Sequence, residues 1–359
     1  MKSSYKLHFI SRAFPPVIGG IENQNHSIYT HLKKHFNLSY SINKKGKKAL
    51  PLFLPLAFIK LVFQKNTTSI LLGDGVLTIL SWFSKVFFKK NRVICIVHGL
   101  DITYSNKIYQ RFWISKFFKS VDTFIAVSTN TKNILISKGI DKEKIHVIPN
   151  GFDFDLVKFK KDINSLNRIV NHNISNKFRL LTLGRLVKRK GVVWFIQNIV
   201  KKLDDSFIYI IAGDGPEKDK ILNTIKAENL SEKVFFCGEV TEYKKEIIFS
   251  NSHLFVQPNI PVVNDIEGFG ISVIEASAYK LPVIAADLEG LKEAIVNNKN
   301  GWLVTPCNQI EYIHTIENYM NLPDKKKNTL ASDFRNFSKK KYDWAIIIKR
   351  YLKVIDDQN

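Results

Sequence analysis

Short apolar runs alternate along the chain with longer stretches in which apolar residues recur at helical spacing. Such runs, bounded by Gly, Asn, Ser or Pro, are typical of buried strands joined by helices. In the first half, strands are expected at residues 6–10, 69–72, 93–97, 123–127 and 146–148. In the second half, they are expected at residues 178–183, 207–212, 234–237, 254–257, 282–285 and 301–304. The alternation predicts an α/β protein with doubly wound parallel sheets.

A cluster of turn-forming residues, Pro149-Asn150-Gly151, marks a boundary between two domains. Residues 158–175 are polar and lack periodicity, which is typical of a linker. We therefore expect an N-terminal Rossmann-like domain at residues 1–165 and a C-terminal one at residues 166–341. Residues 342–359 are expected to form an amphipathic helix, because apolar side chains including Trp344 recur on one face.

The composition is that of a folded globular protein, with 45% hydrophobic and 24% charged residues. A chain of 359 residues is long enough for two domains of ordinary size. Cys95, Cys237 and Cys307 have neither metal-ligand spacing nor a paired framework, which favours a reducing compartment. No uncharged apolar run reaches the roughly 18–20 residues of a spanning helix, so a cytoplasmic protein is expected.

The net charge of +22 is concentrated in the first half of the chain. Residues 1–170 carry 27 Lys and Arg against 9 Asp and Glu, whereas residues 171–359 carry 27 against 23. A basic half indicates a polyanionic neighbour, either nucleic acid or an anionic membrane surface. A lysine-rich surface that arises from compositional bias is the alternative.

The most informative segment contains two glutamates eight residues apart, Glu267 and Glu275. Gly268 and Gly270 permit close approach of the backbone to a ligand, and the following helix start adds a positive dipole end. A carboxylate one or two turns into that helix is able to accept hydrogen bonds from paired sugar hydroxyls. The alternative is an ordinary loop-to-helix junction with a solvated glutamate.

A basic loop follows the first expected strand of the second half. Its Arg185 and Lys190 are five residues apart, so both are able to converge on one diphosphate. Arg offers a planar fork of donors, and Lys offers a compact charge. The alternative is a basic surface turn, which is the interpretation we favour for Lys188 and Arg189.

Two further segments lie where strands end in the first half. Gly19 and Gly20 precede a helix, and paired glycines there are able to present N–H groups to phosphate oxygens. The three spaced glycines of a dinucleotide-binding fingerprint are missing, which argues against a dehydrogenase. His98 ends a buried strand, where a structural role and a ligand contact both remain open.

Together these segments resemble the family 4 retaining glycosyltransferases. The resemblance also includes residues 148–153, 213–216, 236–240, 281–285 and 300–304, and Trp344 at the start of the family's terminal helix. It implies a GT-B fold, in which two Rossmann-like domains face each other across a cleft. Residues 342–359 would then cross back to the N-terminal domain.

The resemblance also implies roles for individual residues. Arg185 and Lys190 would hold the donor diphosphate, and Glu275 would bind the nucleotide ribose. His98 would lie beside the donor sugar. The other expected donor-binding residues are Gly19, Gly20, Val240, Glu267, Gly268, Phe269, Gly270 and Ile271. The residues expected to act in catalysis are His98, Glu267, Arg185 and Lys190.

The implied activity is transfer of a sugar from a nucleotide diphosphate to a hydroxyl of a lipid-linked or oligosaccharide acceptor, with retention of configuration. No cofactor and no metal are expected. Asp153 and Asp155 have the Asp-x-Asp spacing that glycosyltransferases of the other major fold use for a cation, but here we interpret them as a linker feature. A surface polysaccharide or glycolipid pathway is expected.

A protein of another class, a non-catalytic polyanion- or nucleic-acid-binding protein, is the alternative function. It would use the basic first half of the chain. Neither zinc-finger spacing nor an RNP-type aromatic motif is present, so nucleic acid is not an expected partner.

Residues 44–63 suggest attachment to the inner face of the cytoplasmic membrane. A cluster of four lysines precedes an apolar stretch that is too short to span a bilayer but suited to lie in its interface. Residues 86–90 and 112–119 repeat the combination of aromatic residues and lysines. The alternative is that these apolar residues fill the core of the N-terminal domain.

Overall fold

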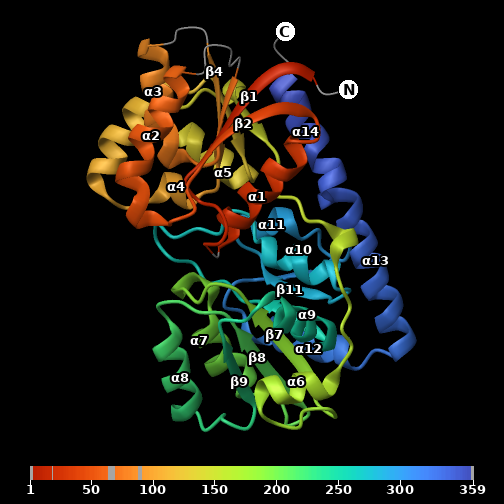
Figure 1. Cartoon of the computed structure of the whole chain (residues 1–359). Helices are drawn as coiled ribbons and strands as arrows, with labels where there is room; N and C mark the ends of the chain where they lie inside the picture. Colours follow the sequence, from red (N-terminus) through yellow and green to blue (C-terminus); the bar gives the residue numbers. More distant parts are fainter. Residues whose placement is uncertain (1–2, 18, 64–68, 88–90, 357–359) are drawn as a thin grey trace. The chain divides into compact units, whose positions relative to one another are not determined.

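A computed structural model of the chain describes residues 3–17, 19–63, 69–87 and 91–356. The chain forms two compact units (Figure 1). Unit 1 comprises Met1–Gly151, Asn264–Phe269 and Trp344–Asn359, and unit 2 comprises Phe152–Val263 and Gly270–Asp343. Unit 1 is thus assembled from three stretches of sequence. The expected domain boundaries lie at residues 165/166 and 341/342, with residues 342–359 returning to the first domain, and they do not include the stretch Asn264–Phe269.

The described part of unit 1 contains a six-stranded parallel sheet in the order β2-β1-β3-β4-β5-β6. The strands are β1 (Ser3–Ser11), β2 (Phe36–Ile42), β3 (Ser69–Leu72), β4 (Arg92–Val97), β5 (Thr123–Ala126) and β6 (Ile145–Val147). The helices are α1 (Gly20–Leu32), α2 (Leu50–Phe63), α3 (Thr78–Phe87), α4 (Leu100–Thr103) and α5 (Thr129–Ser137), with a π-helical segment at Tyr109–Phe117.

Helices cover both faces of this sheet, as a parallel sheet requires. Ile10 belongs to the core that α2, α3 and α5 form over one face. The ring of Phe9, the preceding residue, points to the other face and lies 6.2 Å from the ring of Tyr29 in α1. The strands are therefore apolar on both sides and read as continuous apolar runs in the sequence.

Within its described residues, unit 2 also holds a six-stranded parallel sheet, in the order β12-β11-β10-β7-β8-β9. The strands are β7 (Phe178–Leu183), β8 (Phe207–Ala212), β9 (Val234–Gly238), β10 (Leu254–Gln257), β11 (Val283–Ala286) and β12 (Trp302–Val304). The helices are α6 (Ile163–Val170), α7 (Val192–Phe195), α8 (Lys218–Ala227), α9 (Glu242–Asn251), α10 (Ile271–Ala278), α11 (Leu291–Ala294), α12 (Gln309–Met320) and α13 (Asp324–Tyr342).

Helix α14 (Trp344–Asp356) belongs to unit 1, although it follows unit 2 directly in the sequence. Trp344 is 1% exposed, and its indole stacks on the ring of His31 in α1 with centroids 5.2 Å apart. At the far end of the helix, Arg92 donates hydrogen bonds to the carbonyls of Val354 and Ile355, each at 3.0 Å. Both ends of α14 are therefore held by unit 1.

The eleven strands predicted from the sequence are all present, and the largest difference is that β1 begins at Ser3 rather than at residue 6. Strand β2 was not predicted, because it lies at the sheet edge and carries polar residues and a half-exposed Tyr40. The linker prediction for residues 158–175 was wrong, because α6 lies within it. The Asp162 side chain caps α6 by accepting the Ser165 N–H at 3.0 Å.

Two histidines, the fully buried His8 and the partly buried His253, have surroundings that favour the neutral imidazole. Burial lowers the pKa of His253 to about 3, and the neighbouring Arg179 adds to the effect. The backbone N–H of Arg179 donates to Nδ1 of His253, and the guanidinium lies 2.8 Å from Nε2, so a second proton on the ring would meet an N–H donor at Nδ1. Burial also lowers the pKa of His8, between Ser39 and Ser41, to about 4.

We expect the free energy of unfolding to fall as the pH drops from about 6.5 toward 4. Histidine in the unfolded chain takes up a proton in this range, whereas native His8 and His253 do not, so acid favours the unfolded chain. For each of the two histidines, the free energy of unfolding falls by up to about 1.4 kcal/mol per pH unit. Urea unfolding at pH 7 and pH 5 measures the difference. The control His314→Asn, at an exposed position of α12, should keep the slope, and equal stability at both pH values would contradict the prediction.

Candidate functional site

The order of the strands reverses in the middle of the unit 2 sheet. The chain runs from β7 outward to β8 and β9, and then returns to place β10 on the other side of β7. The connections after β7 and β10 therefore run toward opposite edges of the sheet, to β8 and to β11, and doubly wound sheets bind ligands at such a point. These two loops carry most of the residues that the sequence analysis assigned to the donor.

Arg185 and Lys190 lie in the loop after β7. Arg185 is exposed, whereas Lys190 is 8% exposed. Gly191 ends this loop with φ at 65°, and a Cβ atom there would lie 1.9 Å from the carbonyl oxygen of Pro258. Only glycine therefore allows the loop after β7 to lie directly against the segment after β10.

Side-chain hydrogen bonds fix the start of α10, the helix that follows the β10 loop. Ser272, in its first turn, donates to Gln257 Oε1 at 3.1 Å, and Gln257 Nε2 donates to Asn259 Oδ1 at 2.8 Å. Gly270 and Ile271 lie at the helix start, which begins beside the reversal point. Val240 is half-buried and follows β9, the edge strand next to β8.

Glu275 lies in the second turn of α10 and is held by a lysine that the sequence analysis missed. Lys245 Nζ, from α9, lies 2.7 Å from Glu275 Oε1 and 2.7 Å from Glu242 Oε2. The Lys245 and Glu275 side chains are 15% and 14% exposed. Despite its burial, the two carboxylates raise the pKa of Lys245, so it stays charged. The pairing could not be predicted, because the residues are 30 positions apart on different helices.

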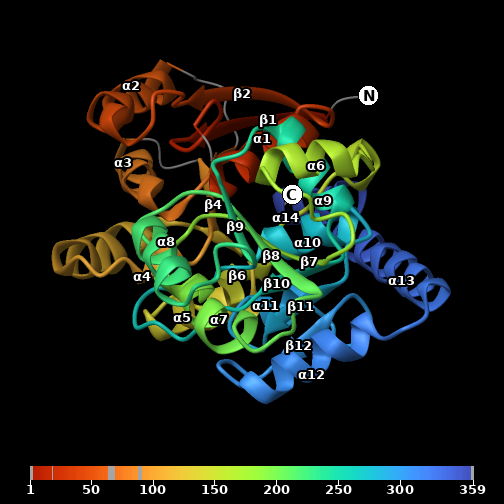
Figure 2. The same ribbon diagram turned by 90° about the horizontal axis from the view of Figure 1, so that it is seen from below.

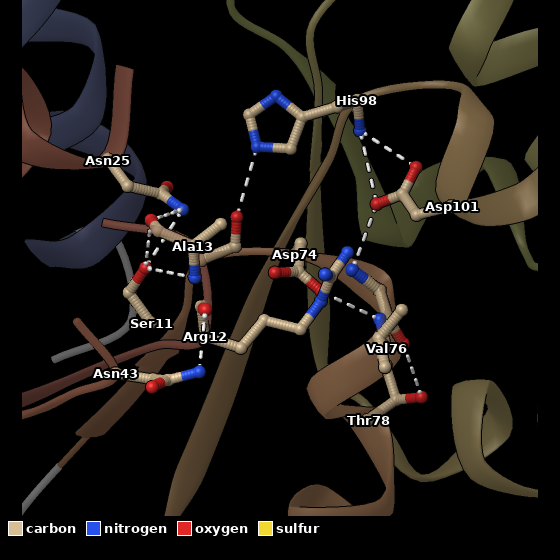
Figure 3. A network of polar contacts seen from close by, with 12 residues as sticks. Ser11, Arg12, Ala13, Asn25, Asn43, Asp74, Val76, Thr78, His98 and Asp101 are labelled. Atoms are coloured by element: carbon tan, nitrogen blue, oxygen red, sulfur yellow. Dashed lines mark hydrogen bonds and ion pairs between the residues drawn. The ribbon is translucent and has the colours of Figure 1, made fainter. Parts of the chain in front are cut away.

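Unit 1 has its own reversal point, between β1 and β3. An ion pair joins the loops that follow these two strands: Arg12 Nε lies 2.8 Å from Asp74 Oδ1 (Figure 3). The Asp74 side chain is fully buried and also accepts the backbone N–H of Val76 at 2.9 Å. Both contacts are made by Oδ1, and Asp74 Oδ2 is buried without a hydrogen-bond partner in the described part of the chain, so the ion pair with Arg12 is the main compensation for burying this carboxylate.

Asp101 extends this network to the loop after β4. Its Oδ1 accepts the N–H groups of His98 at 3.0 Å and Gly99 at 2.9 Å, and its Oδ2 accepts the N–H of Gly75 at 2.9 Å. Burial raises the pKa of the Asp101 carboxyl. The loops after β3 and β4 are therefore held by one carboxyl group (Figure 3).

The same network orients the imidazole of His98, which is 8% exposed. Its Nε2 lies 3.0 Å from the carbonyl oxygen of Gly73, which only accepts hydrogen bonds, so Nε2 carries the proton of the neutral ring. The other nitrogen, Nδ1, is then an acceptor. Gly268 lies against this residue, because a Cβ atom there would be 2.0 Å from the His98 carbonyl oxygen.

The expected site residues divide between the two units. Those in unit 1 are Gly19, Gly20, His98, Glu267, Gly268 and Phe269. Those in unit 2 are Arg185, Lys190, Val240, Gly270, Ile271 and Glu275. Glu267 is 8% exposed and Phe269 is 1% exposed. Gly20 begins α1, and Ile18 of the same loop lies outside the described residues. The structure adds Arg12, Asp74, Asp101 and Lys245 as residues that hold site side chains or site loops in place.

The Asp153 and Asp155 pair does not form part of a metal-ligand cluster. Asp155 lies 2.5 Å from Lys339 Nζ, and this hydrogen bond lowers the pKa of its carboxyl. Among the described residues, no group of three or more His, Cys, Asp or Glu side chains is arranged to hold a metal ion.

Comparison with protein families gives the geometry a context. A model of the family described as "Glycosyl transferases group 1" matches residues 165–340, and one described as "Glycosyltransferase Family 4" matches residues 43–156. The chain belongs to glycosyltransferase family 4. The first of these matches contains every unit 2 residue of the expected site.

Curated relatives of this family 4 glycosyltransferase come from several organisms. The uncharacterized glycosyltransferase MJ1069 of Methanocaldococcus jannaschii is 24% identical over 76% of this chain and 70% of its own length. The O-antigen chain mannosyltransferase RfbU of Salmonella typhimurium is 28% identical over 67% and 64%. The poly(ribitol-phosphate) alpha-N-acetylglucosaminyltransferase of Staphylococcus aureus is 25% identical over 99% and 67%. RfbU is thus matched over less than two-thirds of its length.

Solved structures confirm the fold. Anabaena Alr3699/HepE in complex with UDP and glucose has a TM-score of 0.79 and 20% identity, over 98% of this chain and 99% of that one. Sucrose-phosphate synthase from Thermosynechococcus elongatus has a TM-score of 0.77 and 17% identity, over 98% of each chain. The predicted GT-B fold, with its two doubly wound sheets, is therefore confirmed.

Asp101→Asn tests the polar network of unit 1. An asparagine has one carbonyl oxygen, so its NH₂ group must face either Gly75 N–H or the His98 and Gly99 N–H groups. We expect a loss of about 1–3 kcal/mol in the free energy of unfolding and faster hydrogen exchange at these three amides. Asp205→Asn, at an exposed position, is the control. Unchanged exchange at Gly75, His98 and Gly99 would contradict the assignment.

Proposed function

We propose that this protein transfers a sugar from a nucleotide diphosphate to a hydroxyl group of a saccharide acceptor. The observation that carries the proposal is the position of Arg185, Lys190 and Glu275 on the two segments that flank the reversal point of unit 2. A diphosphate leaving group develops negative charge as it departs, and two preorganised cations at a ligand-binding edge stabilise that charge. Family membership supports the same reaction class.

Each site residue then has a role that its surroundings support. Arg185 and Lys190 hold the diphosphate. Lys245 occupies Oε1 of Glu275, which leaves Oε2 to accept hydrogen bonds from the ribose hydroxyls. His98 Nδ1 accepts a hydrogen bond from a hydroxyl of the transferred sugar, because its Nε2 proton is used by Gly73.

The remaining expected residues line the donor through their backbone or a carboxylate. Glu267 faces the transferred sugar, together with backbone N–H groups of Gly268, Phe269, Gly270 and Ile271. Gly19 and Gly20 approach the diphosphate, and Val240 lies near the base.

The reaction we propose retains the configuration of the sugar and does not use a metal. The bond between the anomeric carbon and the diphosphate oxygen breaks, and a bond from that carbon to the acceptor oxygen forms. The acceptor proton is taken up by the departing diphosphate on the same face of the sugar. Arg185 and Lys190 supply the positive charge that a divalent cation supplies in other sugar transferases.

We propose a lipid-linked saccharide as the acceptor and a surface polysaccharide or glycolipid as the product. RfbU is named an O-antigen chain mannosyltransferase, and the Staphylococcus aureus relative is named for poly(ribitol-phosphate). The proposed place of reaction is the cytoplasmic face of a membrane, where such an acceptor is held. No nucleic acid takes part.

Arg185→Ala should slow transfer strongly while leaving the fold intact. Arg185 is exposed, so its removal loses little packing, but charge-assisted hydrogen bonds to phosphate are lost. At roughly 1.5–3 kcal/mol for each such bond, kcat/KM should fall by about 10- to 100-fold or more. Lys188→Ala, an exposed residue of the same loop, is the control. Similar kcat/KM values for the Arg185 and Lys188 variants would exclude Arg185 from the donor site.

The reaction itself is tested by incubating the protein with a panel of nucleotide sugars and lipid-linked acceptors. We expect transfer from at least one donor, a product whose anomeric coupling constant by NMR matches that of the donor, and full activity in excess EDTA. Activity that disappears with EDTA and returns with manganese would contradict metal independence. An inverted product would contradict retention, and a failure to bind any nucleotide diphosphate by calorimetry would contradict the proposed function.

A further inference from the structure

Helix α2 of unit 1 has two apolar faces, and only one of them is covered. On the inner face, Ala57 and Leu61 are 2% and 3% exposed, and both belong to the core over the sheet. On the outer face, Leu52, Leu56 and Phe63 are 68%, 55% and 79% exposed. An ordinary surface helix carries polar residues on its outer side, so an apolar one needs an explanation.

The exposed residues form a continuous stripe along the helix. Leu52, Leu56, Ile59 and Phe63 are spaced by four, three and four residues, which places them on one side of an α-helix. Lys60, the one charged residue of α2, does not interrupt the stripe. Its Nζ donates to the carbonyl oxygen of Tyr40 in β2 at 2.6 Å and lies over the Tyr40 ring.

The end of α3 continues this surface. Val86 and Phe87 are 52% and 61% exposed, and the ring of Phe87 lies 5.7 Å from the ring of Phe58 in α2. Helices α2 and α3 lie side by side in both views of unit 1 (Figures 1 and 2). We call these six exposed residues the α2 face: Leu52, Leu56, Ile59, Phe63, Val86 and Phe87.

In the stretch of sequence that contains α2, every charged residue is positive. No Asp or Glu occurs between Glu22 and Asp74, whereas eight lysines do. Four of them precede α2 directly and are exposed: Lys44, Lys45, Lys47 and Lys48. An apolar stripe preceded in the chain by four exposed lysines complements a surface that is anionic outside and apolar beneath, as an anionic lipid bilayer is.

The length of α2 determines how it meets a bilayer. At a rise of 1.5 Å per residue, its 14 residues extend about 21 Å, which is less than the hydrocarbon thickness of about 30 Å. No helix in the described part of the chain is long and apolar enough to cross a membrane. A short helix with one uncovered apolar side lies along the interface instead of crossing it.

We propose that the α2 face, together with the four lysines before it, docks unit 1 on an anionic lipid bilayer. This deepens the proposed function, since a lipid-linked acceptor is held at that surface, but docking requires no catalysis. The structure separates the two explanations of residues 44–63 that the sequence left open: one side of α2 fills the core, and the other is free for lipid. Of the two similar segments, residues 88–90 lie outside the described residues, and at residues 112–119 Phe112 is exposed while Phe118 fills the core.

Vesicle flotation of the full chain tests the proposal. The vesicles are phosphatidylcholine alone and an equal mixture of phosphatidylcholine and phosphatidylglycerol. We expect wild type to float with the mixed vesicles at low salt, less at high salt, and little with phosphatidylcholine alone. Two variants are compared with wild type. The triple variant combines Leu52→Ser, Leu56→Ser and Phe63→Ser. The quadruple variant combines Lys44→Ser, Lys45→Ser, Lys47→Ser and Lys48→Ser. Each should weaken the partition coefficient by at least about tenfold.

A matched control uses exposed residues of unit 2: Ile310→Ser with Lys325→Ser and Lys326→Ser. It should float as wild type does. The proposal would be overturned if wild type stays in the soluble fraction with mixed vesicles at low salt. It would also be overturned if the triple variant at Leu52, Leu56 and Phe63 floats as wild type does. Equal losses in the control would show that general charge and apolarity, not the α2 face, cause binding.

Transfer to a water-soluble acceptor without vesicles distinguishes this inference from the proposed function. The triple variant should keep the wild-type rate there, because its substitutions lie at exposed positions of α2 and involve none of the residues assigned to the donor site. If wild type floats but transfers no sugar, the docking surface stands and the proposed function fails. If it transfers but does not float, the reverse holds.

Discussion

The reversal of strand order within each sheet is the constraint on which the rest of this structure depends. Because β10 returns to the opposite side of β7, the connections after these strands run toward opposite edges of the sheet, and ligands of doubly wound sheets bind where they begin. The cationic loop of Arg185 and the helix of Glu275 occupy those two positions. Unit 1 repeats the arrangement between β1 and β3, where an ion pair between Arg12 and Asp74 joins the two loops.

The polar residues at these two edges are held in different ways. In unit 2, Gly191 allows one loop to lie on the carbonyl of Pro258, and Lys245 holds Glu275 through an ion pair between two helices. In unit 1, buried carboxyl groups dominate, and Asp101 gathers N–H groups from two loops. Buried charge in a hydrogen-bonded network orients a side chain such as His98 closely, because any other arrangement leaves a polar group unsatisfied.

Most of the strands could be predicted from the sequence because parallel strands covered on both faces form continuous apolar runs. Strand β2 was not predicted because an edge strand tolerates polar residues. Helix α6 was not predicted because its first turn has the composition of a polar linker, unless Asp162 is recognised as its N-cap. Local motifs were enough to name the expected donor residues, which remain a prediction, whereas the contacts of Lys245 and Asp101 could not be predicted. Their roles come from contacts between helices and loops that only the fold brings together.

The discontinuity of unit 1 has a consequence for how the protein is made. A chain leaves the ribosome N-terminus first, and domains generally fold as units while synthesis continues. Unit 2 ends at Asp343 and is complete before α14 has appeared, whereas unit 1 still lacks the helix that carries Trp344. The His31 ring therefore lacks Trp344, and the Arg92 guanidinium lacks the carbonyl of Val354, until late in translation. The first domain to be synthesised is thus the last to be finished.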